Sequence, residues 1–151
     1  MIKNCIKCGI DKKADCFHKS SRHLDGYLNK CKDCRFIETH SMTSRARRMY
    51  ADQKKSSKVR GHAPPMYSSD EFLQWCLSKD SYRKLHKEWA NSGYKKNLSP
   101  SADRINDYEG YSFDNIQLMT WGENNAKHYK DRVDGVNNKV NKICLKKLFS
   151  K

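Results

Sequence analysis

The chain is short of acidic residues and of long apolar runs. Asp and Glu together number 17 among 151 residues, against 31 Lys and Arg, and hydrophobic residues make up 36%. So small an apolar fraction buries only a modest core. The length of 151 residues is enough for one ordinary domain, or for two small ones if metal holds one of them together. No run of about 18 apolar residues occurs, so we expect neither a transmembrane helix nor a membrane partner.

An export signal is also missing. The first residues, MIKNCIKCG, contain no apolar stretch of the kind that a signal peptide needs, so we expect a cytoplasmic protein. Seven cysteines without such a signal indicate a reducing compartment, and metal ligation rather than disulfide bonds.

The excess of basic residues gives a formal net charge of +14. A charge of this size favours a polyanionic partner, because each Lys or Arg placed near a phosphate releases counterions. Charge alone does not separate DNA, RNA and anionic lipid as that partner.

Two Cys-x-x-Cys pairs, Cys5 with Cys8 and Cys31 with Cys34, are separated by 22 residues. This spacing is typical of four thiolates around one tetrahedral Zn²⁺, and a site with four thiolates leaves no open position, so the zinc would be structural. We therefore expect a four-cysteine zinc ribbon over residues 1–38; the alternative is two buried pairs of reduced thiols. The remaining cysteines are expected to be small core residues: Cys16, Cys76 and Cys144.

Basic residues dominate the segment 39–65, which contains a single acid, Asp52. We expect a basic helix that dissolves into a linker before Pro64, and either a contact with the DNA backbone or a merely solvated face. The candidate DNA-binding residues are Arg45, Arg47, Arg48, Lys54 and Lys55. Residues 132–151 are predicted as a basic C-terminal tail.

Residues 66–98 are predicted to be helical. Ser68 and Glu71 have the spacing of a capping box at the start of a first helix. A second helix presents Tyr82, His86 and Trp89 on one apolar face and is expected to end near Gly93. On this face His86 is either a packed core residue or a group that faces an active cleft.

The segment 99–131 is predicted as a strand, a turn, a strand and a helix. The strands are expected at residues 102–106 and 115–120, and the helix begins near Trp121. Asn124 lies three residues before Lys127 and four before His128, so these side chains share one helical face. If that helix packs on the hairpin, Asp103 and Asn124 can meet around one ion.

The residues from Pro100 to Lys127 form the pattern PSADRI-x₄-GYS-x-DNIQLMTW-x-EN-x₂-K, and this pattern resembles the HNH endonuclease family. The run from Phe72 to Tyr94 is also similar to the phage-borne and homing branch of that family, in which some members carry cysteine-built zinc sites upstream. The resemblance implies an α+β protein with an N-terminal zinc ribbon, a helical linker and a ββα-metal nuclease core over residues 66–131.

The resemblance also implies roles for individual residues. Asp103 and Asn124 match the ligands of a catalytic Mg²⁺ or Mn²⁺. Asn115 matches a residue that ties the hairpin loop together, Lys127 a position that touches phosphate, and His128 the final His of nuclease toxins with this motif.

One position departs from the family pattern. Arg104 stands where the family usually has its general base, a His directly after the first metal ligand. Arg does not give up its proton at ordinary pH, so Arg104 is expected to stabilise negative charge on the phosphate instead. The base is then the metal's own hydroxide or a side chain, and the candidates are His86, ranked first, Tyr82 and His128.

The sequence thus predicts a metal-dependent endonuclease that nicks or cuts duplex DNA, in the host bacterial cytoplasm if a phage encodes it. One alternative is a non-catalytic zinc-ribbon DNA-binding regulator with a degenerate nuclease fold, which Arg104 favours; another is a protein that binds or cleaves RNA. Whether the protein forms a homodimer stays open.

Overall fold

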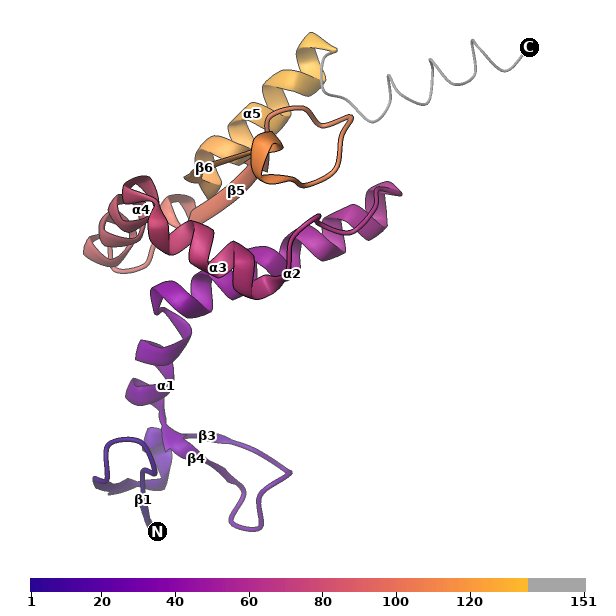
Figure 1. Ribbon diagram of the computed structural model, residues 1–151. Helices are drawn as coiled ribbons and strands as arrows, with labels where there is room; N and C mark the ends of the chain where they lie inside the picture. The colour runs from indigo at the N-terminus through magenta and orange to yellow at the C-terminus, as the bar shows by residue number, and fades with distance from the viewer. Residues whose placement is uncertain (136–151) are drawn as a thin grey trace. The chain divides into compact units, whose positions relative to one another are not determined.

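The computed structural model describes residues 1–135. Its chain divides into two compact units, the first covering Met1–Ser44 and the second beginning at Arg45 (Figure 1). The expectation for Cys144, and that for the tail beyond residue 135, lie outside the described residues. None of the helices within residues 1–135 has the length and apolar character needed to cross a membrane.

The first unit contains two small antiparallel sheets and a helix. Their bounds are β1 (Ile2–Asn4) with β2 (Asp11–Lys13), β3 (Phe17–Lys19) with β4 (Tyr27–Cys31), and α1 (Lys32–Thr39). The buried core of this unit consists of Cys5, Phe17 and Cys31, with Tyr27 packed against it. Cysteine sulfur therefore makes up much of the small apolar interior.

The second unit combines helices with one hairpin, so a mixed helix-and-small-sheet architecture is confirmed. Its elements are α2 (Met42–Arg60), which starts in the last residues of the first unit, α3 (Ser69–Ser78), α4 (Asp80–Asn91), β5 (Pro100–Arg104), β6 (Ile116–Thr120) and α5 (Trp121–Asp134). Short 3₁₀ turns precede β5 and β6, at Lys96–Leu98 and Phe113–Asn115.

Local signals set the ends of α3 and α4. The Ser68 side chain accepts from the Glu71 N–H while Glu71 reaches back to the Ser68 N–H, so the expected capping box is present. Helix α4 ends at Asn91, and Gly93 follows with φ of 74°, a left-handed conformation that glycine adopts without steric cost.

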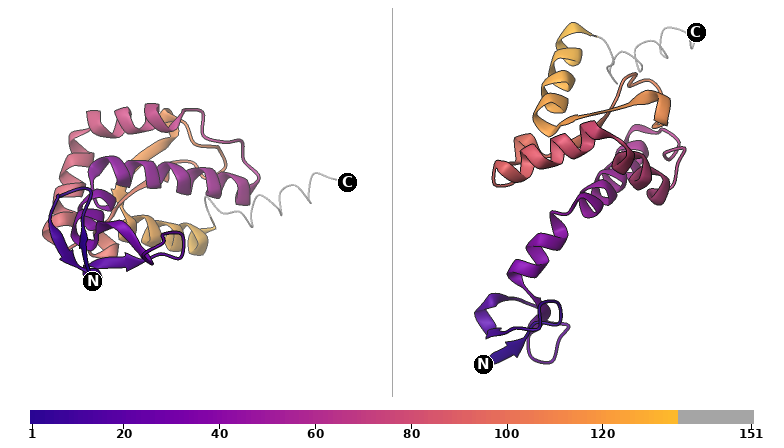
Figure 2. Two further views of the ribbon diagram at one scale, coloured as in Figure 1. Left: turned by 90° about the horizontal axis from the view of Figure 1, so that it is seen from below. Right: turned by 60° about the vertical axis from the view of Figure 1, so that its left-hand side comes forward.

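The hairpin and α5 follow one another without a linker. Strands β5 and β6 pair from Pro100 with Thr120 to Arg104 with Ile116, and α5 starts at the next residue, Trp121. Thr120 and Glu123 form a second capping box, which fixes the start of α5. Helix α5 contacts both strands (Figure 2), so the expected order of strand, turn, strand and helix is present.

Helix α2 packs into the second unit through a face that the sequence did not predict to be buried. Its buried face carries Ala46, Met49, Gln53 and Ser57, and the Tyr67 hydroxyl donates to Gln53 Oε1 at 2.7 Å. The helix ends at Arg60, so the linker expected before Pro64 is confined to the residues that follow it.

Aromatic rings hold the hairpin loop. Phe113, just before β6, stacks on Tyr67 at a ring separation of 4.3 Å and on Trp75 at 5.6 Å. Tyr67 also stacks on the buried Phe72 at 5.4 Å. These rings tie the loop between β5 and β6 to α3 and its preceding segment.

We predict that Thr120→Ala lowers the free energy of unfolding by about 1 kcal/mol, because it removes the oxygen that caps α5. Guanidinium denaturation followed by near-ultraviolet circular dichroism measures this change. Thr43→Ala, at an exposed threonine of α2, is the control. Equal stability of the two variants would contradict the capping role.

Candidate functional site

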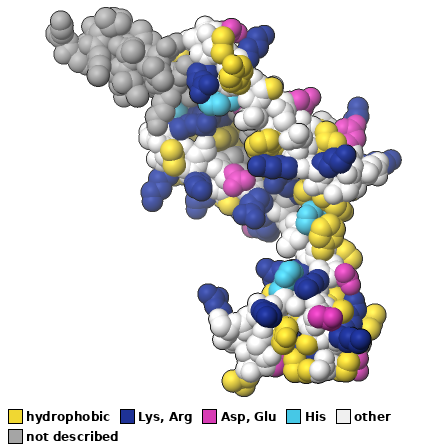
Figure 3. Space-filling model, turned by 180° about the vertical axis from the view of Figure 1, so that it is seen from behind, with side chains coloured by type: hydrophobic (Ala, Val, Ile, Leu, Met, Phe, Trp, Pro, Cys, Tyr) yellow, Lys and Arg dark blue, Asp and Glu magenta, His cyan; other side chains and the backbone are white. Residues whose placement is uncertain are grey.

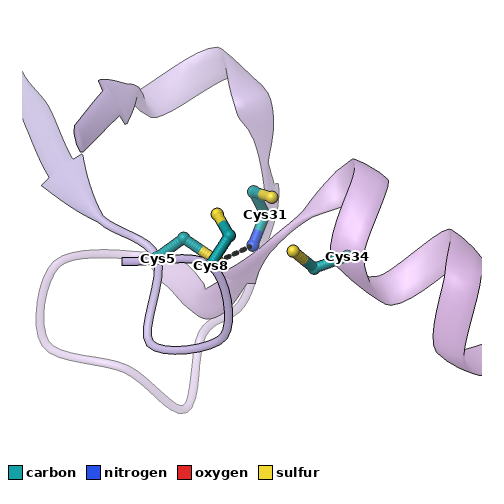
Figure 4. A group of neighbouring side chains, drawn as sticks. All are labelled: Cys5, Cys8, Cys31 and Cys34. Carbon is teal, nitrogen blue, oxygen red and sulfur yellow. Dashed lines mark hydrogen bonds between the residues drawn. The ribbon is translucent and has the colours of Figure 1, made fainter. Parts of the chain in front are cut away.

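The four cysteines predicted to bind zinc converge in the first unit. The sulfur atoms of Cys5, Cys8, Cys31 and Cys34 all lie within 4.8 Å of one another, and Figure 4 shows the side chains gathered beside the start of α1. A tetrahedral zinc with Zn–S bonds of about 2.3 Å needs sulfurs about 3.8 Å apart, so the cluster is close to a ligating arrangement.

The protonation of these thiols depends on their neighbours. The backbone N–H of Cys31, whose nitrogen lies 3.2 Å from Cys5 Sγ, and that of Cys8 lower the pKa of the Cys5 thiol to about 6. The hydrogen bond with the Cys31 sulfur, and then burial, raise the pKa of Cys34 to about 12. Four thiolates so close together repel one another, and a divalent cation compensates that repulsion. The donor set therefore fits a structural Zn²⁺.

A second candidate site lies within the second unit. A cavity of about 290 Å³ has α2 as one wall and the hairpin with α5 as the other. The lining residues from α2 include Arg45, Asp52, Gln53 and Arg60; those from the hairpin and α5 include Asp103, Arg104, Asn124, Lys127 and His128. The two predicted ligands of the catalytic metal thus line one cavity.

Two contacts between β5 and α5 place these ligands. Asn124 Nδ2 donates to Ser101 Oγ at 2.9 Å, and Lys127 Nζ lies 3.2 Å from Asp103 Oδ2. Ser101 and Asp103 are two apart on a strand and so share a face, while Asn124 and Lys127 are three apart on a helix. The amide of Asn124 is oriented by its Nδ2, and its Oδ1 is the atom that could ligate a cation.

Asp103 is nearly buried, at 8% exposure, and its carboxylate is held from two directions. Its Oδ2 accepts from Gln117 Nε2 at 3.0 Å, and Gln117 is its register partner on β6. The same oxygen faces the ammonium of Lys127.

Lys127 lies between several acceptors. Its Nζ donates to Asp131 Oδ2 at 2.9 Å and to the Arg104 carbonyl at 3.4 Å. Burial alone would lower the pKa of Lys127, but the hydrogen bond to Asp131 and the attraction of Asp103 outweigh it and raise that pKa. Lys127 is therefore a firmly held cation at the cavity wall.

Arg104 lines the cavity, but its side-chain contacts lie within the hairpin loop. Its side chain is 2% exposed, its Nη2 lies 3.3 Å from Asp107 Oδ1, and its Nη1 donates to the Glu109 carbonyl at 2.9 Å. The guanidinium also lies 5.1 Å from the centre of the Tyr111 ring. These contacts fix the loop after β5.

Asn115 closes the same loop. Its Oδ1 accepts from the Asn106 N–H at 2.8 Å, and its Nδ2 donates to the carbonyls of Asn106 and Gly110 at 3.0 and 2.9 Å. This arrangement has the loop-tying geometry that the family resemblance implies for Asn115.

The three candidates for the general base occupy different places. His128 lines the cavity, whereas His86 and Tyr82 are not among its lining residues. His86 lies edge-on to Trp89 at a ring separation of 5.7 Å, and Tyr82 is fully buried. The ranking of His86 ahead of His128 has no support in this geometry.

The candidate DNA-binding residues divide into two groups. Arg45 Nε donates to the Pro100 carbonyl at 2.8 Å and so pins α2 to β5, and Arg47 pairs with Asp70 at 2.8 Å. Arg48, Lys54 and Lys55 lie on the exposed face of α2. Lys and Arg side chains outnumber acidic ones on the face that Figure 3 shows.

Sequence reasoning missed two residues that contact the site, Gln117 and Asp131, and the role of helix α2. Gln117 alternates with its strand neighbours, and its pairing with Asp103 could have been inferred from the hairpin register. Asp131 follows Lys127 by four residues, a spacing typical of helical ion pairs. The role of α2 as a cavity wall was harder to predict from the sequence, because the polar Gln53 interrupts the apolar pattern of its buried face.

No protein-family model matches this chain, and no curated protein matches it. Among solved structures, the chain is similar to the rare-cutting HNH restriction endonuclease PacI. The two sequences are 22% identical, the similarity covers 83% of this chain and 81% of that one, and the TM-score is 0.40. A TM-score this low does not establish matching side-chain positions in the two proteins. The arrangement of the site residues described above therefore rests on the contacts within this chain alone.

We predict that Cys8→Ser removes bound zinc and unfolds the first unit, because a structural zinc supplies folding free energy to a small domain. Zinc content by elemental analysis and hydrogen exchange of residues 1–44 measure the two effects. Cys16→Ser, at a half-buried cysteine of the same unit, should retain one zinc per chain. Full zinc content in Cys8→Ser would exclude the four-thiolate site.

Proposed function

We propose that this protein is a metal-dependent endonuclease that hydrolyses phosphodiester bonds of duplex DNA. The observation that carries the proposal is the cavity of the second unit, which gathers Asp103, Asn124, Lys127 and His128. A carboxylate, an amide, an ammonium and an imidazole supply cation ligation, phosphate binding and proton transfer, which are the requirements of phosphodiester hydrolysis.

Asp103 and Asn124 are the residues that would hold the divalent cation. Carboxylate and amide oxygens are ligands that Mg²⁺ and Mn²⁺ prefer, and a site with few protein ligands leaves positions for water and phosphate. When bound, the cation supplies Lewis-acid stabilisation of negative charge on the phosphate and the leaving oxygen.

His128 is the residue that we assign to water activation. It lines the same cavity as Asp103 and lies four residues after Asn124 on α5. In this role one imidazole nitrogen accepts the proton of the attacking water. Arg104 holds the loop through Asp107 and Glu109, and in doing so positions the end of β5 beside the reacting phosphate.

The duplex would be held by charge. The exposed residues Arg48, Lys54 and Lys55 lie on the same helix, α2, whose other face lines the cavity. Contacts of this kind fix the position of a DNA backbone without reading its sequence, and they weaken as salt concentration rises. Membership of the phage-borne and homing branch remains a proposal that rests on the motif.

A non-catalytic DNA-binding regulator is the second candidate. The residue after Asp103 is an Arg that contributes four contacts to its own loop, and such a residue also suits a site that has lost its chemistry. The two functions differ in one result, because the regulator would bind duplex DNA without cutting it under any divalent metal. A binding competition between duplex DNA and a structured RNA tests the other alternative, a protein that binds or cleaves RNA.

We predict that the wild-type protein cleaves supercoiled plasmid with Mg²⁺ or Mn²⁺, and that Asp103→Asn reduces the rate at least about a hundredfold. Asp114→Asn removes an exposed carboxylate outside the cavity and is expected to leave the rate unchanged. Intact plasmid with wild-type protein over a range of metals and sequences, with DNA binding retained, would favour the regulator.

We predict that His128→Ala lowers the cleavage rate about a hundredfold or more, as loss of a general base does, while duplex binding is retained. His86→Ala is the matched comparison and should change the rate less than about threefold. Single-turnover rates at saturating metal and filter binding give the two quantities. A larger loss in His86→Ala than in His128→Ala would reverse the assignment.

A further inference from the structure

Lys127 and the proposed metal ion would both interact with the carboxylate of Asp103. The ammonium lies 3.2 Å from Asp103 Oδ2, and the side chains of Lys127 and Asp103 are 25% and 10% exposed. A divalent cation ligated by Asp103 would therefore lie close to a positive charge that is held in place and largely shielded from bulk solvent. Repulsion at such separations changes cation affinity severalfold or more.

Asp131 holds the ammonium from the other side. Its Oδ2 lies 2.9 Å from Lys127 Nζ, shorter than the distance to Asp103, and its side chain is 14% exposed. Asp131 is one helical turn further along α5, where it is a neighbour of Lys127, and its attraction competes with that of Asp103 for the same ammonium. Lys127 is thus shared between two carboxylates, only one of which is a proposed metal ligand.

We propose that Lys127 is a built-in competitor for the divalent cation at Asp103, and that Asp131 is a positioning residue that sets the strength of this competition. The inference rests on the proposed function, since it concerns the same metal site. It predicts opposite effects for two neighbouring substitutions. Removal of the ammonium strengthens metal binding, whereas neutralisation of its second carboxylate partner strengthens the pairing of the ammonium with Asp103 and weakens metal binding.

The test measures Mn²⁺ binding to the zinc-loaded full chain, without DNA, by electron paramagnetic resonance of free Mn²⁺. We expect Lys127→Met to tighten the Asp103-dependent site roughly five- to thirtyfold. Asp131→Asn should weaken the site at least about twofold, and Lys127→Arg should stay near the wild-type affinity because it keeps the charge.

The double variant shows whether Asp131 acts through Lys127. If it does, Lys127→Met combined with Asp131→Asn binds Mn²⁺ as tightly as Lys127→Met alone. If Asp131 attracts the cation directly, the double variant is weaker than Lys127→Met by the factor seen in Asp131→Asn, and the positioning role is overturned.

Charge-matched controls lie on the same helix. Lys130→Met changes the net charge as Lys127→Met does, and Asp134→Asn changes it as Asp131→Asn does. Lys130 and Asp134 are exposed residues of α5, and each substitution should shift the affinity less than about twofold. Misfolding does not mimic the expected pattern, because it would weaken binding in both Lys127→Met and Asp131→Asn.

The remaining outcomes separate this inference from the proposed function. Unchanged or weaker binding in Lys127→Met, with binding still abolished in Asp103→Asn, overturns the competition and leaves the metal site standing. Absence of Asp103-dependent Mn²⁺ binding in every variant overturns the metal site and the competition together.

Discussion

The geometry of the cavity depends on how one strand meets one helix. Residues two apart on β5 repeat about every 6.6 Å, while residues three apart on α5 repeat about every 4.5 Å. Two successive contacts join the strand to the helix despite these unequal spacings: Asn124 meets Ser101, and Lys127 meets Asp103. The capping box at Thr120 starts α5 at the residue after β6, so the hairpin register also sets which helical residue reaches which strand residue.

Within a strongly basic chain, the contacts of each cation decide what it can do. Arg45 and Arg104 give their hydrogen bonds to backbone carbonyls of the hairpin and so build the cavity. Lys127 faces two carboxylates, one of which belongs to Asp103, the proposed metal ligand. Exposed residues of α2 such as Lys55 keep their charge at the surface, where it acts on a polyanion at longer range.

The parts of this protein that sequence predicts well are those fixed by local chemistry. The capping box at Ser68 needs only four residues and is present, and the two cysteine pairs, each four residues long, lie together as their common spacing predicts. The packing of α2 was missed because its buried face carries Gln53, which weakens the apolar periodicity. His86 shows a second limit: a helical stripe indicates that a residue faces inward, but it does not indicate which interior space the residue faces.

The two candidate metal sites differ in how they relate to folding. In the first unit, two of the three buried core residues, Cys5 and Cys31, are also the proposed zinc ligands, so packing and ligation are one interaction. The second unit buries residues such as Phe72 and Tyr82, and neither of them is a proposed metal ligand. If the proposed cation binds at Asp103, its loss would leave this core intact, whereas loss of zinc would remove the ligation that joins Cys5 and Cys31 in the core of the first unit.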